Sequence, residues 1–240
     1  MTPYFLILIP ALVAILGGFL AVIWHPSAQA RSLIQHFTAG VILAALAVEI
    51  LPELQREHVD QWLLIAAFTG GALFMYGMKL WSEQMAYKAS LRPQAGMLNH
   101  GLILACLIDV MVDGLIIGAG FAADAQTGFV LALGLSVELL FLGLSLVSDT
   151  IKGWRVVLMT TFLSFVVLIS SLLGNHFLAD APKELVSVIL AFGIAVLLYL
   201  VTDELLIEAH EVEEKPHSVL WLFAGFLAFW SIQLFSTSAL

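Results

Sequence analysis

The stretch Ala105-Cys106-Leu107-Ile108-Asp109-Val110-Met111-Val112-Asp113-Gly114-Leu115-Ile116-Ile117-Gly118 places two aspartates inside a long apolar run. An apolar run of about 20 residues is long enough to cross a bilayer as a helix. In such a helix Asp109 and Asp113 lie on one face, one turn apart. A charge near the bilayer midplane costs roughly 2.5–3.5 kcal/mol on insertion scales. Water, protons, a partner or a cation must therefore compensate the two carboxylates.

The composition of the whole chain indicates a polytopic membrane protein. Of its 240 residues, 61% are hydrophobic and only 11% are charged, and the mean hydropathy is +1.03. Soluble domains carry about 25% charged residues. The nine basic residues are scattered and the net charge is −9, which excludes nucleic-acid binding and suits cations instead. The single cysteine, Cys106, excludes an intramolecular disulfide framework.

Eight apolar stretches predict an all-α fold with eight transmembrane helices, in one domain that covers residues 1–240. The first stretch lacks the basic segment of a cleavable signal peptide, so we expect it to span the bilayer as well. The connections are short, and the longest loop is expected at about 82–97. The predicted helices cover about 3–24, 32–54, 61–81, 98–122, 128–150, 154–176, 184–206 and 218–238.

The distribution of lysine and arginine predicts the orientation in the membrane. With the N-terminus outside, the cytoplasmic loops hold seven of the nine basic residues. An even number of helices then puts both termini outside the cell membrane. The cytoplasmic residues are Arg31, Lys79, Lys88, Arg92, Lys152, Arg155 and Lys215, and the external ones are Arg56 and Lys183.

A short motif recurs at the ends of two predicted helices. Glu49-Ile50-Leu51-Pro52-Glu53 closes the second, and Glu204-Leu205-Leu206-Ile207-Glu208 closes the seventh. In the predicted orientation the second helix ends outside and the seventh ends inside. The two motifs would therefore be inverted copies, an arrangement that is common in secondary transporters.

Acidic side chains follow one another across the predicted membrane. Glu49 and Glu53 lie toward the outer end of the second helix, and Glu204 and Glu208 toward the inner end of the seventh. Near the middle of the fourth and fifth helices lie Asp109, Asp113 and Glu138. No lysine or arginine is expected deep inside a span, so the deep acids must hold protons or cations, or face water. Their spread favours a cation path.

Structural explanations compete for several of these residues. Glu53, Glu208 and Asp149 lie at span ends, where a carboxylate can simply reach headgroup water. Cys106 could add a soft ligand one turn before Asp109, but a buried cysteine more often fills space. We expect His36 and His176 to be interfacial, and His210 and His217 to be candidates for passing a metal to the cytosol.

Small residues continue the helix that carries the aspartates. Gly114, Gly118 and Gly120 would allow close contact with a neighbouring helix. We expect that neighbour to be the fifth helix, which brings Glu138, with Gly134 and Gly143 on its side of the contact. Nothing in the sequence resembles a nucleophile triad, a phosphate-binding loop or a His-Glu-x-x-His motif, so we do not expect an enzyme.

Together these features resemble the ZIP (Zrt/Irt-like) family of divalent metal transporters. Ala39-Gly40-Val41-Ile42-Leu43, continuing to the motif at 49–53, is similar to the family's A-G-[VI]-[FM]-L…H-L-L-P-E, with Glu49 in place of histidine. The segment 193–208 resembles G-M…L-[YF]…[DE]-[ML]-L-P-E, with Ile207 in place of proline. Asp113-Gly114 matches the end of H-N-x-x-[DE]-G. Glu138 aligns with the acid of H-E-x-P.

The chain departs from the family in its histidines. Asp109-Val110 stand where the family has His-Asn, and Val137 stands where it has the histidine of the fifth helix. The resemblance implies eight helices, no prosthetic group, a transported divalent metal, and a homodimer as a partner. The resemblance also implies that Asp109, Asp113 and Glu138 form the transport site, and that gate or relay residues are Glu49, Glu204 and Glu208. We therefore expect a single carboxylate-rich site in place of the binuclear site of the family.

The expected function is import of zinc, or of manganese or iron, into the cytoplasm. Oxygen ligands suit harder cations such as Mn²⁺, while the family resemblance favours Zn²⁺. Clustered acids repel one another without a cation, so metal binding would release protons. Two alternatives stay open: a related transporter that moves another substrate or protons, and a non-transporting scaffold that binds metal.

Overall fold

The computed structural model describes residues 3–24, 26–57, 59–90, 100–145, 153–210 and 217–237. Within these residues eight helical segments are long and apolar enough to cross a membrane, and no strand occurs. The prediction of an all-α polytopic membrane protein is therefore confirmed. The helices are α1 (Pro3–Ile23), α2 (Ala28–Ala45), α3 (Leu51–Arg56), α4 (Gln61–Ser90), α5 (His100–Ala123), α6 (Ala125–Ser145), α7 (Trp154–Leu178), α8 (Lys183–Tyr199), α9 (Leu206–His210) and α10 (Ser218–Thr237).

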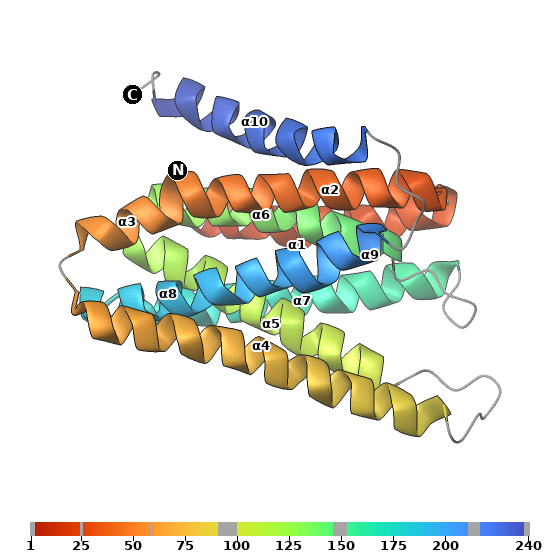
Figure 1. The fold of residues 1–240 in the computed structure, drawn as a ribbon, viewed down its shortest axis with the longest axis horizontal. Helices are drawn as coiled ribbons and strands as arrows, with labels where there is room; N and C mark the ends of the chain where they lie inside the picture. Colours follow the sequence, from red (N-terminus) through yellow and green to blue (C-terminus); the bar gives the residue numbers. More distant parts are fainter. Residues whose placement is uncertain are drawn as a thin grey trace.

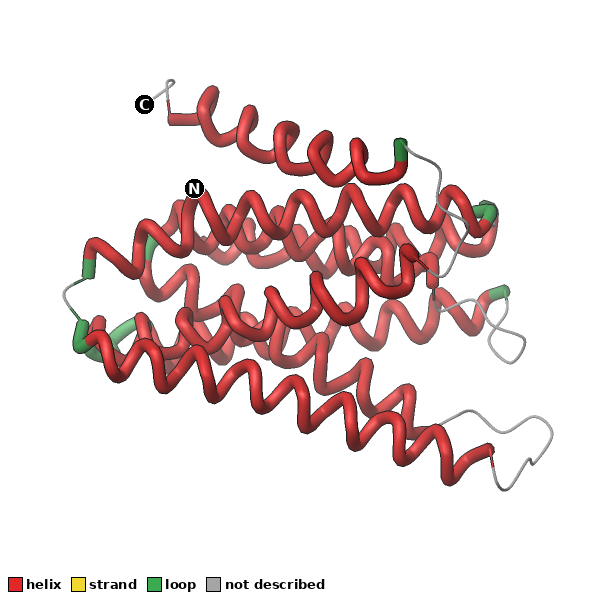
Figure 2. Tube along the Cα trace, viewed as in Figure 1, coloured by secondary structure: helices red, strands yellow, loops and turns green. Residues whose placement is uncertain are grey.

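The spans lie side by side as a bundle (Figures 1 and 2). In Figure 1, α4 and α10 lie at opposite edges, α10 against α2 and α4 chiefly against α8. These two helices are also the least buried of the eight spans. The start of α1 and the end of α10 lie at the same end of the bundle (Figure 1).

Several helix boundaries differ by a few residues from those expected from the sequence, and two of these differences have a local explanation. The helix that begins at Gln61 continues to Ser90 instead of ending near residue 81. The segment 82–90 contains neither proline nor glycine, so nothing in it stops the helix. The helix that was expected from 128 begins at Ala125, because Asp124 caps it. Asp124 Oδ1 accepts hydrogen bonds from the backbone N–H groups of Gln126 (2.7 Å) and Thr127 (2.9 Å).

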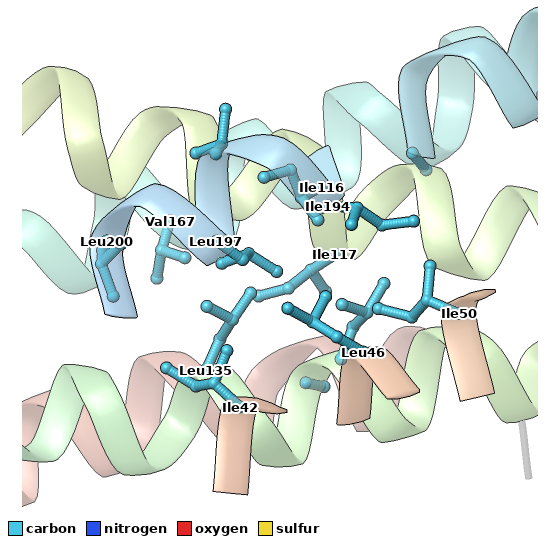
Figure 3. Close-up of a cluster of buried hydrophobic side chains, with 14 of the residues drawn as sticks. Ile42, Leu46, Ile50, Ile116, Ile117, Leu135, Val167, Ile194, Leu197 and Leu200 are labelled. Atoms are coloured by element: carbon cyan, nitrogen blue, oxygen red, sulfur yellow. The ribbon is translucent and has the colours of Figure 1, made fainter. Parts of the chain in front are cut away.

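The core lies where α2, α5, α6, α7 and α8 meet. Figure 3 shows branched aliphatic side chains from these helices converging on one another. Since lipid tails are as apolar as leucine, close packing rather than escape from water holds such helices together. The labelled side chains are Ile42, Leu46, Ile50, Ile116, Ile117, Leu135, Val167, Ile194, Leu197 and Leu200.

The glycines of α5 pack mainly against α7, which corrects the expectation that they face the fifth span. A Cβ on Gly118 would meet the backbone of α7, 2.7 Å from the nitrogen of Asn175, and one on Gly114 would lie 2.7 Å from the carbonyl oxygen of Val167. The reason is helical geometry, because each residue advances by about 100° around the helix axis, so Gly114 and Gly118 lie about 100° and 140° from Asp113.

The other glycines that were expected to line the contact between α5 and α6 face several different helices. Gly120 does contact α6, where a Cβ would lie 3.1 Å from the Cα of Gly128. Gly143 of α6 instead faces Gly17 and Gly18 of α1, and Gly134 faces Ala45 of α2. The small residues therefore join α5 and α6 to three different neighbours.

Both copies of the recurring acidic motif begin in π-helical turns. One turn, η1 (Leu46–Ile50), joins α2 to α3 and contains Glu49. The other, η2 (Leu200–Leu205), joins α8 to α9 and contains Glu204. The two helices run in opposite directions (Figure 1), so the copies lie at opposite ends of the bundle. Single π turns inside α-helices often mark functional positions.

Candidate functional site

Three carboxylates meet between α5 and α6. One ligand oxygen from each of Asp109, Asp113 and Glu138 lies within 4.8 Å of the others. The local sequence explains this contact. Asp109 and Asp113 share one face of α5, and the single residue Asp124 turns the chain back into α6. Asp109 and Glu138 are about equally far from that turn along the chain, so the antiparallel helices bring them level.

The trio is buried in the bundle and short of hydrogen-bond donors. Asp113 is 0% exposed and Glu138 6% exposed, and Asp109 is half-buried. Both carboxylate oxygens of Asp113 and Oε2 of Glu138 have no hydrogen-bond partner within the described part of the chain. Buried polar atoms are nearly always satisfied in folded proteins. Three buried oxygens that converge without donors are an arrangement that a cation or protons can satisfy.

Glu204 and Cys106 lie beside this trio. The carboxylate of Glu204, in η2, is near enough to interact electrostatically with Asp113 and Glu138. The thiol of Cys106 is near enough to interact with all four acids. The exposed side chain of Glu204 thus continues the line of acids from the trio toward the end of the bundle where α8 joins α9.

Glu49 lies apart from the trio, at the opposite end of the bundle. Its buried Oε2 accepts hydrogen bonds from Nε2 of Gln126 (3.2 Å) and from Nε2 of Gln233. The charged groups that it interacts with are Asp124, Arg56 and Glu53. Glu53 in turn is paired with Arg56 at 3.3 Å. Glu49 therefore joins η1 to α6 and α10 at this end of the bundle.

Replacing Gln233 with alanine should lower the melting temperature of the protein by several degrees. Hydrogen bonds to charged groups contribute about 1.5–3 kcal/mol, and 1 kcal/mol corresponds to roughly 2–4 °C for a chain of this size. Thermal unfolding in detergent measures the shift. Ile232→Ala is the matched control, since Ile232 is 56% exposed on the same helix. Equal melting temperatures for the two variants would show that the contact with Glu49 adds no stability.

The other sequence-derived residues are placed as follows. Because α4 continues to Ser90, Lys79 lies inside that helix, where its Nζ is 2.6 Å from Oδ1 of Asp203, next to Glu204. The backbone of Glu208 lies in α9, but its side chain lies outside the described residues, as does Asp149. Sequence reasoning missed the Lys79–Asp203 pair and the two glutamines on Glu49. These interactions join helices that are far apart in the sequence, so no local sequence pattern could have indicated them.

No family model matches the chain, and no curated protein matches it. The function must therefore be argued from the site. Three carboxylates within reach of one point can bind a divalent cation through oxygen ligands.

Proposed function

We propose that the protein transports a divalent metal ion across the membrane, bound on its way by Asp109, Asp113 and Glu138. The observation that carries this proposal is the convergence of three carboxylates in the middle of the bundle, with the oxygens of Asp113 lacking donors in the described chain. An acidic side chain inside the membrane costs free energy, so such a residue usually has a function, such as binding a transported ion. The resemblance to ZIP transporters points to the same function.

The path runs from Glu49 and Glu53 at one end, through the trio, to Glu204 at the other. The starts of α2 and α7 and the end of α4 lie at the same end of the bundle as η2 (Figure 1), and these segments carry Arg31, Arg155, Lys79 and Lys88. Arg56 and Lys183 interact with Glu53 at the other end. Arg92, Lys152 and Lys215 lie outside the described residues. By the positive-inside rule the Glu204 end faces the cytoplasm and both termini lie outside. With this orientation, the resemblance to ZIP importers favours import into the cytoplasm as the direction of transport. The π turns η1 and η2 flank the trio from the two ends and supply places where the helices can bend.

Zinc is the nominal ion, with manganese and iron as the other candidates. The trio offers oxygen ligands only. Such ligands bind Mn²⁺ and Fe²⁺, and carboxylate oxygens also bind Zn²⁺, at a zinc–oxygen distance of about 2.0–2.2 Å. A site of moderate affinity suits a transporter, because the ion must also leave.

The decisive experiment is metal uptake into proteoliposomes that contain the purified protein. Zn²⁺, Mn²⁺, Fe²⁺, Ca²⁺ and Mg²⁺ are measured in parallel against protein-free liposomes, together with internal pH. We expect uptake of at least one of the first three that saturates with concentration. Metal that binds without crossing the membrane would indicate a scaffold, and proton movement without metal movement would indicate a different substrate. Either result would overturn the proposal.

A further inference from the structure

A buried histidine in the middle of α2 has a ring nitrogen without a partner among the described residues. His36 is 1% exposed, and its Nδ1 lies 2.8 Å from the carbonyl oxygen of Ser32. A carbonyl only accepts, so Nδ1 carries the hydrogen and donates it. The other nitrogen, Nε2, therefore bears a lone pair, and it has no partner within the described part of the chain. An interfacial histidine, as expected from the sequence, would have water there.

A second histidine approaches the first from α9. The ring centres of His36 and His210 are 5.5 Å apart, with the rings tilted by 43°. Nδ1 of His210 contacts the carbonyl oxygen of Leu206, one turn back. The same reasoning assigns the hydrogen to Nδ1 and the lone pair to Nε2. Both rings are thus held in the tautomer that histidine adopts when it binds a metal through Nε2, with the other nitrogen donating to a backbone carbonyl.

The two helix ends are tied together beside these rings. Oγ of Ser32 donates a hydrogen bond to the carbonyl oxygen of Ala209 at 2.8 Å, in a buried position. Ser32 is also the residue whose carbonyl orients His36, and Ala209 precedes His210. The contact therefore fixes the ring of one histidine relative to the backbone of the other. Two imidazoles bonded through Nε2 at about 2.0–2.1 Å to one tetrahedral ion have ring centres roughly 5 Å apart.

We infer that His36 and His210 form a second metal site, between α2 and α9, for a divalent ion that prefers nitrogen ligands, such as Zn²⁺, Co²⁺, Ni²⁺ or Cu²⁺. Each ring contributes Nε2. His210 is exposed, so water reaches the remaining coordination positions. With two protein ligands among the described residues, the site exchanges its ion readily. It differs in chemistry from the trio, which offers oxygen, and its existence does not depend on transport.

Electron paramagnetic resonance of bound Cu²⁺ tests this site, because nitrogen ligands split the signal and oxygen ligands do not. The full-length protein is used without a histidine tag and titrated with Cu²⁺ alone. We expect a signal from two nitrogen ligands in the wild type. His210→Ala should leave one nitrogen ligand and weaken binding at least tenfold. His210 is exposed, so this variant should remain folded, while His36→Gln provides the corresponding test from the buried side.

Two controls separate this site from the others. His176→Ala removes a histidine from α7 and should keep the two-nitrogen signal. Asp113→Asn should also keep it, so failure of the transport proposal leaves this result unaffected. A wild type without two-nitrogen ligation, or a two-nitrogen signal that persists in His210→Ala, would refute the His36–His210 site.

Discussion

Replacing Asp113 with asparagine should reduce divalent metal uptake by about 100-fold, which corresponds to about 2.7 kcal/mol of lost binding. Asp113 is 0% exposed and is the central residue of the trio, because it shares a face of α5 with Asp109 and lies opposite Glu138. Asparagine keeps the shape and one carbonyl oxygen but loses the negative charge. Uptake into proteoliposomes, measured at equal protein density, gives the ratio to wild type.

This variant should remain folded, which makes the measurement interpretable. A buried carboxylate without donors is costly to the fold, so its neutral analogue should melt at the same temperature as the wild type or higher. Asp180→Asn is the matched control, since Asp180 is exposed in the turn between α7 and α8. If Asp113→Asn transports metal at the wild-type rate, the trio is not the transport site.

Replacing Gly118 with alanine should destabilise the protein by about 1–3 kcal/mol, the usual cost of overpacking. The added Cβ would lie 2.7 Å from the nitrogen of Asn175 and 2.9 Å from the Cα of Gly174, and it would also meet the carbonyl oxygen of Ser171. All three atoms belong to the backbone of α7. None can move alone, so α5 and α7 must separate along their contact.

Thermal unfolding in detergent measures this effect against a second glycine. Gly77→Ala is the control, because a Cβ on Gly77 of α4 would meet nothing within 4 Å. Alanine is the better helix former by about 0.8–1.0 kcal/mol in water, so this control should not lower the melting temperature. A Gly118→Ala protein as stable as the Gly77→Ala protein would mean that α5 and α7 do not pack as closely as described.

The features that the sequence predicted well depend on local periodicity. An apolar run of about 20 residues is required to cross the bilayer, so eight runs gave eight spans. The spacing of Asp109 and Asp113 placed them on one face, and Glu138 was expected beside them. Glu138 reaches that face through the short turn at Asp124, and not through the contact of Gly114 and Gly118 that the sequence suggested. Each of these inferences needs only helical geometry and a short connection.

The features that the sequence did not predict depend on which helices become neighbours. Gly118 was expected to face α6 and instead faces α7. The partners of Glu49 come from the start of α6 and the far end of the chain, and the approach of His36 to His210 joins segments far apart in sequence. Lys79 was placed at a helix end because the helix was expected to stop early. Tertiary packing decides the first three, and no short window of residues contains that information. The length of α4 is different, because the absence of proline and glycine from 82–90 is a local signal for a longer helix.

The single-residue connection at Asp124 has a consequence for how the ion leaves. All three carboxylates of the trio belong to the hairpin of α5 and α6, and Asp124 holds its bend by accepting hydrogen bonds from the N–H groups of Gln126 and Thr127. Helix movements elsewhere in the bundle therefore do not pull the ligand set apart. In the proposed cycle the ion keeps its coordination while its surroundings change. Release then requires water to reach the ion while the three carboxylates keep their arrangement. Release of the ion should therefore slow as the activity of water falls.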